Sequence, residues 1–347
     1  MARSLSCIPY RPVVGPPERA WIENALFFCV FLPSPAREAA ASRAMKIENT
    51  KGPKPFLKWV GGKTQLLPEL MARLPHDFST TVKVYAEPFV GGGALLFHLL
   101  SKGLHPERIV INDSNPELAN VWRTVQIFTD YLVESLARLE ADYLALSCED
   151  AKRAFYLGIR SAFNAGRLTG PSPDVSRAAQ MVFLNKTCFN GLYRVNAKGL
   201  FNVPFGKYHK PIICDETTIR NASTALKGVE ILCGDFADSV ADAGSGWLIY
   251  FDPPYRPISE TSAFCDYTQC GFGDAEQRRL AKLCHDLDAK GARWLLSNSE
   301  AKDGFFDDLY RGFTCDRVYA ARAINSKGNG RGKIGEIIVS NIGGSGL

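Results

Sequence analysis

Chemistry is most clearly indicated by the stretch Leu248–Tyr255, which reads Leu-Ile-Tyr-Phe-Asp-Pro-Pro-Tyr. Its apolar half predicts a strand, so one carboxylate, Asp252, and one aromatic ring, Tyr255, would lie at the end of that strand. Asp252 and the main-chain carbonyl of Pro253 could accept both hydrogens of an exocyclic amine and draw its lone pair out of an aromatic ring. Pro253 and Pro254 restrict the direction of that carbonyl. The stretch therefore predicts attack by an amino nitrogen on a methyl group.

Adenine is a suitable acceptor for this tetrapeptide. Its N6 is delocalised into the ring and is paired inside a duplex, so an enzyme must rotate the base out, and Tyr255 could stack on the rotated base. Transfer from a sulfonium methyl held in line needs positioning and charge, and we expect no metal. Taken alone, the residues could also form an ordinary turn with a surface tyrosine.

A glycine-rich turn, Val84–Gly93, is the second candidate, because a strand there passes through glycines into a helix. Backbone N–H groups of such a turn can hold a nucleotide-like ligand. Its candidate cofactor contacts are Glu87, Phe89, Gly91 and Gly93. No Gly-Lys-Ser/Thr follows, which excludes a Walker-type phosphate loop, while a purely structural turn stays open.

Two further strand ends carry a carboxylate. Asp113 lies twenty residues beyond Gly93, which is the spacing at which a doubly wound fold binds ribose hydroxyls. A helix N-cap is the alternative role for Asp113. After the third predicted strand, Asp235 and Phe236 would lie at the same edge of the sheet, where we expect them to hold the adenine ring of the cofactor.

The elements that position these residues follow an α/β pattern, in which short β-rich runs alternate with helix-like stretches. Strands are predicted at 82–87, 108–113, 229–233, 247–252, 293–297, 314–319 and 336–339, and helices at 66–74, 93–102 and 276–290. More than a hundred residues separate the second and third strands. We therefore expect a core of 45–114 and 216–347, interrupted by a helical domain at 115–215 with a β-hairpin at about 185–208.

Positive charge and aromatic rings gather in the predicted insertion. No Asp or Glu occurs from Val175 to Cys214, and the stretch carries Arg177, Lys186, Arg194, Lys198, Lys207 and Lys210. Such a stretch predicts a surface that faces phosphates, although a plain solvated hairpin is the alternative. Within it, Phe189, Asn190 and Arg194 are residue types that wedge between bases or read their edges.

Two other basic segments could contact a ligand. Phe56–Lys63 combines Lys58, Trp59, Lys63 and two glycines, which suits a loop over a ligand, or else a basic surface turn. The tract 325–333 predicts a loop on the DNA backbone or a linker.

Composition limits the remaining possibilities. With 347 residues, 46% of them hydrophobic, and a net charge of +5, the chain is globular and only weakly basic. Its ten cysteines include no Cys-x-x-Cys pair, so a zinc site or disulfide framework is not expected and a cytoplasmic location fits. The first 45 residues contain no lysine. We expect Met45 to be the natural start and 1–44 to be disordered or not native, with a secretory leader as the weaker alternative.

Six motifs in order resemble the Dam-type, or D12 class, site-specific DNA adenine-N6 methyltransferases. They span Phe56 to the C-terminus and comprise Phe56–Lys63, Glu87–Gly93, Asn112-Asp113, Asn190-Gly191-Leu192, Phe201–Gly206 and Asp252–Tyr255. The resemblance implies a Rossmann-like S-adenosylmethionine-dependent core with a seven-stranded sheet whose last strand is antiparallel. It also implies an inserted helical domain and hairpin that read DNA.

The resemblance also implies roles for single residues. Trp59, Lys63, Asp113 and Asp252 fall on cofactor-binding positions, and Asp252–Tyr255 on the catalytic motif. The positions that face DNA are Lys58, Phe189, Asn190, Leu192, Arg194, Pro204 and Lys207. Since Lys58 and Arg194 match base contacts of members that recognise GATC, we expect methylation of the central adenine of GATC in double-stranded DNA. Phe189 replaces an intercalating tyrosine, which puts flanking preference and flipping efficiency in question.

Other readings stay open within this framework. A restriction-modification methylase with another short target would be chemically identical. An RNA or protein-amide methyltransferase usually has Asn where this chain has Asp252. A silent DNA-binding protein would need a broken cofactor site, yet Gly91, Asp113 and Asp252 are all present. We expect a monomer without an obligate protein partner or a membrane segment.

Overall fold

The computed structural model describes residues 52–59, 61–170, 172–256, 272–301, 303–321 and 333–343. All of them belong to the compact unit Lys51–Leu347. The expectations for 1–44 and Met45, and for nearly all of the tract 325–333, therefore fall on residues outside the described ones. Within the described ranges, none of the helices combines the length and the apolar character needed to cross a membrane.

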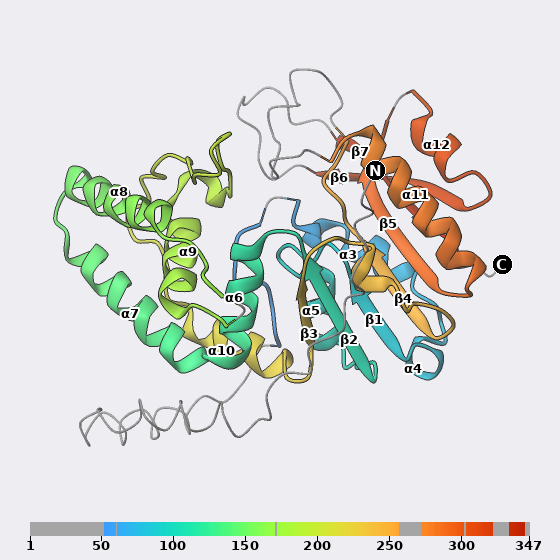
Figure 1. Cartoon of the computed structure of the whole chain (residues 1–347), viewed down its shortest axis with the longest axis horizontal. Coiled ribbons are helices and arrows are strands. Elements are labelled where there is room, and N and C mark those ends of the chain that lie inside the picture. The colour runs from blue at the N-terminus through green and yellow to red at the C-terminus, as the bar shows by residue number, and fades with distance from the viewer. Residues whose placement is uncertain are drawn as a thin grey trace, which may run out of the picture. The chain divides into compact units, whose positions relative to one another are not determined.

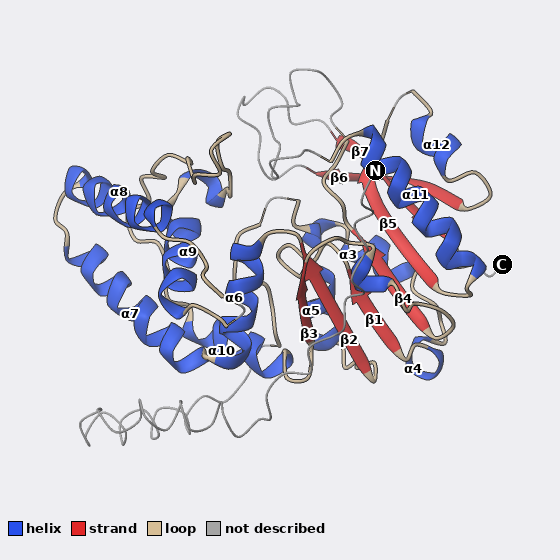
Figure 2. Ribbon diagram, viewed as in Figure 1, coloured by secondary structure: helices blue, strands red, loops and turns tan. Residues whose placement is uncertain are grey.

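One seven-stranded sheet forms the centre of this unit, with the order β3-β2-β1-β4-β5-β7-β6 (Figure 2). Its strands are β1 (Val84–Glu87), β2 (Arg108–Asp113), β3 (Glu230–Cys233), β4 (Trp247–Phe251), β5 (Arg293–Ser299), β6 (Thr314–Ala321) and β7 (Lys333–Ser340). The first five pair in parallel, whereas β7 is antiparallel to both β5 and β6. The predicted α/β class and the antiparallel last strand are confirmed.

Helices cover both faces of the sheet because alternate strand residues point to opposite sides. Tyr250 of β4 belongs to the core beneath α3 (Leu67–Ala72) and α5 (Ala94–Ser101). Phe251, the next residue, belongs to the core beneath α11 (Asp274–Ala289) and α12 (Phe305–Leu309). Three short elements complete this part: η2 (Lys63–Gln65), α4 (Phe78–Thr81) and η4 (Asp238–Val240).

Five helices lie between β2 and β3 in the sequence: α6 (Pro116–Ile127), α7 (Thr129–Ala145), α8 (Glu149–Ala165), α9 (Val175–Thr187) and α10 (Glu216–Ala225). Figure 1 shows them gathered beyond the β3 side of the sheet. Helix α9 is central, since it packs against α6, α7 and α8 and buries Met181, Phe183 and Leu184. These helices fill the long gap between the second and third strands, and the division into a core and an inserted domain stays a prediction.

The predicted hairpin at 185–208 takes a different form. Residues 185–187 belong to α9, and the following 188–206 loop contains η3 (Phe189–Gly191) and two isolated antiparallel bridges, Cys188↔Phe205 and Val195↔Phe201. No continuous ladder forms between the two bridges because residues 189–194 are opposed by the shorter segment 202–204 and begin with the η3 turn. The chain still runs out and back, but it forms no strand.

Candidate active site

Strand alternation gathers polar groups on one face at one end of the sheet. Tyr85 and Tyr250 lie in the same core, so the residues two positions later, Glu87 and Asp252, share their face. Ser297 of β5 pairs with Ile338 of β7, another residue of that core. Glu336 of β7 pairs with Ser299 at the end of β5 and so lies at the same end of the sheet. We call the group Glu87, Asp252, Ser297 and Glu336 the carboxyl edge.

Asp252 is the best-connected carboxylate of the carboxyl edge. Lys63 Nζ lies 2.6 Å from its Oδ1, and the Lys63 side chain is only 6% exposed. Ser297 Oγ donates to the same oxygen at 3.1 Å. Burial raises the pKa of Asp252, while Lys63 opposes that rise. The Asp252 side chain is 20% exposed, and a partly buried carboxylate paired in this way depends on its partners to keep its charge.

The residues that follow Asp252 are held from several directions. The carbonyl of Pro254 accepts a hydrogen bond from Gln277 Nε2 at 3.1 Å, and Pro253 is buried. Tyr255 Oη donates to Glu336 Oε2 at 2.6 Å. Lys63 Nζ lies 4.4 Å from the centre of the Tyr255 ring, a cation–π distance.

Glu87 is a carboxylate without a cationic partner among its described contacts. Its side chain is 2% exposed and accepts a hydrogen bond from Tyr85 Oη at 2.7 Å. Burial, with a smaller contribution from the charge of Asp252, raises the pKa of Glu87 to about 8. The group is therefore largely neutral at pH 7.

The glycine turn packs tightly against two indole rings. A Cβ on Gly91, where φ is +48°, would lie 2.8 Å from Trp59, and one on Gly93, where φ is +66°, would lie 2.6 Å from Trp122. The Trp59 ring also stacks on Tyr193, with centroids 5.7 Å apart. Close packing against an indole ring therefore explains why both positions are glycine. The Trp59 ring lies against the backbone of the turn.

Asp113 ends β2 beside this turn. Its Oδ2 accepts the N–H of Gly91 at 3.2 Å and its Oδ1 the N–H of Asn115 at 2.9 Å. Burial raises the pKa of Asp113 to about 6, against these two hydrogen bonds. Asn115, and not Asp113, caps α6 through its side chain. The N-cap alternative for Asp113 is therefore wrong.

Asp235 and Phe236 lie at the end of β3, as expected. The carboxylate of Asp235 is bound by the Arg279 guanidinium, with Nη1 at 2.9 Å from Oδ1. That guanidinium lies 4.1 Å from the centre of the Phe236 ring, and Phe236 is buried with its centroid 5.2 Å from that of Phe89. Arg279 is thus an unpredicted neighbour of the expected adenine position.

Asn185 joins the 56–63 segment to the 188–206 loop. Its Oδ1 accepts the N–H of Lys58 at 2.9 Å, and its Nδ2 donates to the carbonyls of Lys58 at 2.6 Å and Gly191 at 2.9 Å. The side chain is buried. A Cβ on Gly191, where φ is +65°, would lie 2.6 Å from that of Lys58. The backbones of Lys58 and the Asn190-Gly191-Leu192 turn are therefore locked together.

The predicted base-facing side chains lie around this lock. Phe189 is 47% exposed, and its N–H donates to the carbonyl of the exposed Pro204 at 2.9 Å. Arg194 is exposed and its Nε donates to Asn202 Oδ1 at 2.8 Å. Lys207 pairs with Glu149 at 2.8 Å, across the base of the loop. The 188–206 loop thus presents an aromatic ring and a guanidinium to solvent.

Two cations of the acid-free stretch do not face solvent. Arg177 is buried and pairs with Glu117 at 2.6 Å, so its predicted contact with phosphates is wrong. It joins α9 to α6 instead. Burial lowers the pKa of Lys186, which is only partly exposed. The sequence pattern could not distinguish these two because a helix face is set by three-dimensional packing. Lys198 and Lys210 are exposed.

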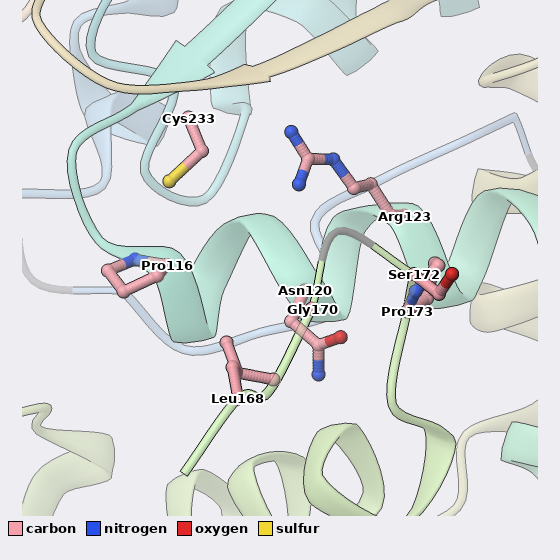
Figure 3. Close-up of a pocket in the computed structure, with 8 residues that line it drawn as sticks. All are labelled: Pro116, Asn120, Arg123, Leu168, Gly170, Ser172, Pro173 and Cys233. Atoms are coloured by element: carbon pink, nitrogen blue, oxygen red, sulfur yellow. The ribbon is translucent and has the colours of Figure 1, made fainter. Parts of the chain in front are cut away.

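Two cavities lie near the candidate residues. One, of about 110 Å³, lies between α6, the 168–173 segment and the end of β3; Figure 3 shows Arg123 rising from α6 toward the strand end that carries Cys233. The Arg123 guanidinium donates to the Ile231 carbonyl at 2.9 Å. The other, of about 350 Å³, lies between α8 and residues 204–207.

No cluster of His, Cys, Asp or Glu suited to a metal occurs in the described part of the chain.

Besides Arg279, four residues of this region were not predicted: Asn185, Gln277, Ser297 and Glu336. Ser297 had a usable signal, because polar residues follow the apolar run Trp294-Leu295-Leu296 just as Asp252 follows its own strand. Glu336 opens a predicted strand, but only its antiparallel pairing brings it to this end of the sheet. Asn185 and Gln277 lie within helices, where the sequence gives no sign of their distant partners.

Comparison with known proteins gives consistent results. A family model described as D12 class N6 adenine-specific DNA methyltransferase matches residues 59–324. The Type II methyltransferase M.MjaIII of Methanocaldococcus jannaschii is 47% identical over 80% of this chain and 95% of its own length. M1.LlaDCHI of Lactococcus lactis subsp. cremoris is 40% identical, over 84% and 96%. The DNA adenine methylase of Serratia marcescens is 34% identical, over 82% and 96%.

The match covers most of the described chain and most of each relative. It includes the glycine turn, the carboxyl edge except Glu336, and the 188–206 loop. The chain belongs to the D12 class N6 adenine-specific DNA methyltransferases.

Proposed function

We propose that this enzyme transfers a methyl group from S-adenosylmethionine to N6 of the central adenine of GATC in duplex DNA. The observation that carries the proposal is the lock at Asn185, which holds the backbone of Lys58 against the turn that precedes Arg194. Lys58 and Asn185, the residues that form the lock, are 127 residues apart in the sequence. The lock therefore joins the segment of Lys58 to the distant loop that carries Arg194. Two cations suited to guanine edges are thereby held in one frame.

The donor chemistry of the glycine turn suits S-adenosylmethionine, which supplies a methyl group on a positively charged sulfonium. Each oxygen of Asp113 accepts one backbone N–H and keeps a lone pair for a ribose hydroxyl. We assign further contacts to Trp59, Glu87 and Phe89, and the adenine end to Asp235 and Phe236. The charges of Asp252 and Glu336 favour a cation near them.

Asp252 has one oxygen available for the substrate. Lys63 and Ser297 both contact Oδ1, so we assign Oδ2 as the acceptor of one N6 hydrogen. The carbonyl of Pro253 accepts the other hydrogen, and the ring of Tyr255 stacks on the rotated adenine. The chain thereby holds the amine with its lone pair directed at the methyl group.

A duplex with a single GATC tests this function. Purified enzyme with tritiated S-adenosylmethionine should label this duplex, and changing one base pair of the site should lower kcat/KM by about 1 to 3 kcal/mol in transition-state free energy. Nuclease digestion should recover the label as N6-methyladenine. Equal labelling of the changed duplexes would contradict the proposed target.

Methylation of a different short site is the second candidate. Two relatives are named Type II methyltransferases. Thr187, Cys188 and Phe189 depart from the enterobacterial pattern of the family, in which more tyrosine is usual at these positions. Labelling of mixed genomic DNA without labelling of GATC duplexes would favour this candidate. In either case we propose a monomer that acts on the nucleoid in the cytoplasm, for which sedimentation of the purified protein and cell fractionation are the tests.

A further inference from the structure

The hydroxyl of Tyr255 is held by a residue from the far end of the chain. Tyr255 Oη donates to Glu336 Oε2 at 2.6 Å, across 81 residues of sequence. Both side chains are partly buried. Burial, followed by the charges of Asp252 and Glu336, raises the pKa of Tyr255 well above its usual value. The hydroxyl therefore keeps the proton that it donates.

The antiparallel strand β7 explains why Glu336 can reach this position. Glu336 pairs with Ser299 at the end of β5, so the beginning of β7 lies beside the carboxyl ends of the parallel strands. Glu336 shares its face with Ile338, two residues later, which packs in the same core as Tyr250. A parallel strand in this place would put its carboxyl end here instead.

Other residues hold the backbone around Tyr255. Gln277 Nε2 donates to the Pro254 carbonyl at 3.1 Å. Asn298 Oδ1 accepts the N–H of Arg256 at 3.3 Å, and Ser299 Oγ donates to the Arg256 carbonyl at 3.0 Å. Since other residues hold the main chain on both sides of Tyr255, the hydrogen bond that Tyr255 donates to Glu336 acts on the ring.

We propose that Glu336 is a positioning residue that holds the ring of Tyr255 at the angle needed to stack on the rotated adenine. The inference rests on the proposed function, because it acts through the stacking role of Tyr255. A carboxylate that accepts from a hydroxyl makes a short, strong hydrogen bond, which limits rotation of the ring. Glu336 thus prepares the site before the base enters it.

A double-mutant cycle tests this role by single-turnover methyl transfer and by fluorescence of 2-aminopurine at the target base. Glu336→Ala should slow transfer by about 10²-fold and leave the affinity for duplex DNA unchanged. Glu336→Gln keeps an acceptor oxygen and should lose only about 3-fold to 10-fold, since a neutral acceptor bonds more weakly. In a Tyr255→Phe background neither substitution should slow transfer further.

The control is Glu230→Ala on β3, which removes a strand glutamate that pairs with Arg108 away from the carboxyl edge; its rate should equal that of wild type. Multiplying effects of Glu336 and Tyr255 substitutions, or a wild-type rate for Glu336→Ala, would overturn the inference. Should Glu336→Ala fail to fold, the Glu336→Gln and Tyr255→Phe pair completes the same cycle. A wild-type enzyme that methylates no DNA would instead remove the proposed function.

Discussion

At the carboxyl edge, alternate residues of four paired strands bring Glu87, Asp252, Ser297 and Glu336 together, whereas the 188–206 loop contains two isolated bridges and no strand. Side chains from the helices hold that loop instead. Asn164 of α8 bonds both backbone groups of Phe201, at 3.0 and 2.8 Å, and Tyr156 Oη donates to the Val203 carbonyl at 2.7 Å.

Under the proposed function, this difference lets one fold keep its chemistry while it varies its target. Moving a residue of the carboxyl edge requires a change in the sheet, because every strand there is paired on both sides or buried. A side chain of the loop, such as Arg194, can change without disturbing a ladder. Substitutions in the two regions should therefore have separable effects on rate and on discrimination.

The largest effect should come from the carboxyl edge. Asp252→Ala removes an acceptor for the N6 hydrogens, and we expect single-turnover methyl transfer to fall by about 10³-fold. Duplex affinity, measured by fluorescence anisotropy, should change little because the 188–206 loop is untouched. The control Asp286→Ala removes a carboxylate paired with Lys282 on α11 and should keep the wild-type rate. If Asp252→Ala lost duplex affinity as strongly as it lost methyl-transfer rate, the two regions would not have separate roles.

The next effect concerns pH and stability. Burial raises the pKa of Glu87 from 4.5 to about 8, so the folded state binds this proton more tightly than the unfolded state. The resulting stabilisation is complete below pH 4.5 and is lost as pH rises through 8, at about 1.4 kcal/mol for each unit of pKa difference. Urea unfolding at pH 5 and pH 9 should show this fall.

A substitution identifies Glu87 as the cause of the fall. Glu87→Gln should flatten the dependence between pH 5 and pH 9, leaving the smaller fall due to Asp113, whose raised pKa of about 6 has the same sign, and to Asp252, whose pKa is also raised. The exposed Glu107→Gln should follow the wild-type curve. A Glu87→Gln curve parallel to that of wild type would show that Glu87 does not titrate in this range.

A smaller effect should follow from the lock between segments. Asn185→Ala removes three hydrogen bonds to Lys58 and Gly191, and we expect it to lower the free energy of unfolding by about 1 to 3 kcal/mol. It should also reduce discrimination between GATC and duplexes changed at one base pair. Asn164→Ala loosens the same loop without touching Lys58. Equal loss of discrimination in both variants would argue against the lock.

The most narrowly confined effect, limited to one base pair, should come from Arg194. Arg194→Ala should lower discrimination at one base pair by about 1 to 3 kcal/mol, measured as the ratio of kcat/KM for matched and changed duplexes. Lys198→Ala, another exposed cation of the loop, should weaken binding to all duplexes alike and reduce the salt dependence. Unchanged discrimination in Arg194→Ala would assign the base contact to another residue.

Sequence patterns predicted the sheet better than the loop. Apolar runs that end in Asp113 and Asp252 identified β2 and β4 within one residue, because a strand end with a carboxylate is a local signal. The start of the hairpin was wrong by three residues, since α9 continues through Thr187. Helix α9 extends this far because it packs against three other helices, and no local sequence pattern indicates that packing.

The site residues also separate into those with a local sequence signal and those placed by long-range contacts. Asp113, Asp252 and Tyr255 were selected because each lies at or just beyond the end of a strand, and their roles stay predictions. Glu336 was missed because its contact with Tyr255 spans 81 residues, and Arg177 was misjudged because its partner Glu117 lies 60 residues away. Long-range pairings of this kind are decided by the folded topology.

The central claim is that residues of the carboxyl edge catalyse methyl transfer to an adenine, and that the 188–206 loop determines which adenine is methylated. The most direct test treats unmethylated genomic DNA with the purified enzyme and S-adenosylmethionine and maps N6-methyladenine by sequencing. We predict modification of the central adenine of GATC on both strands. Modification at another motif, or none at all, would contradict the claim.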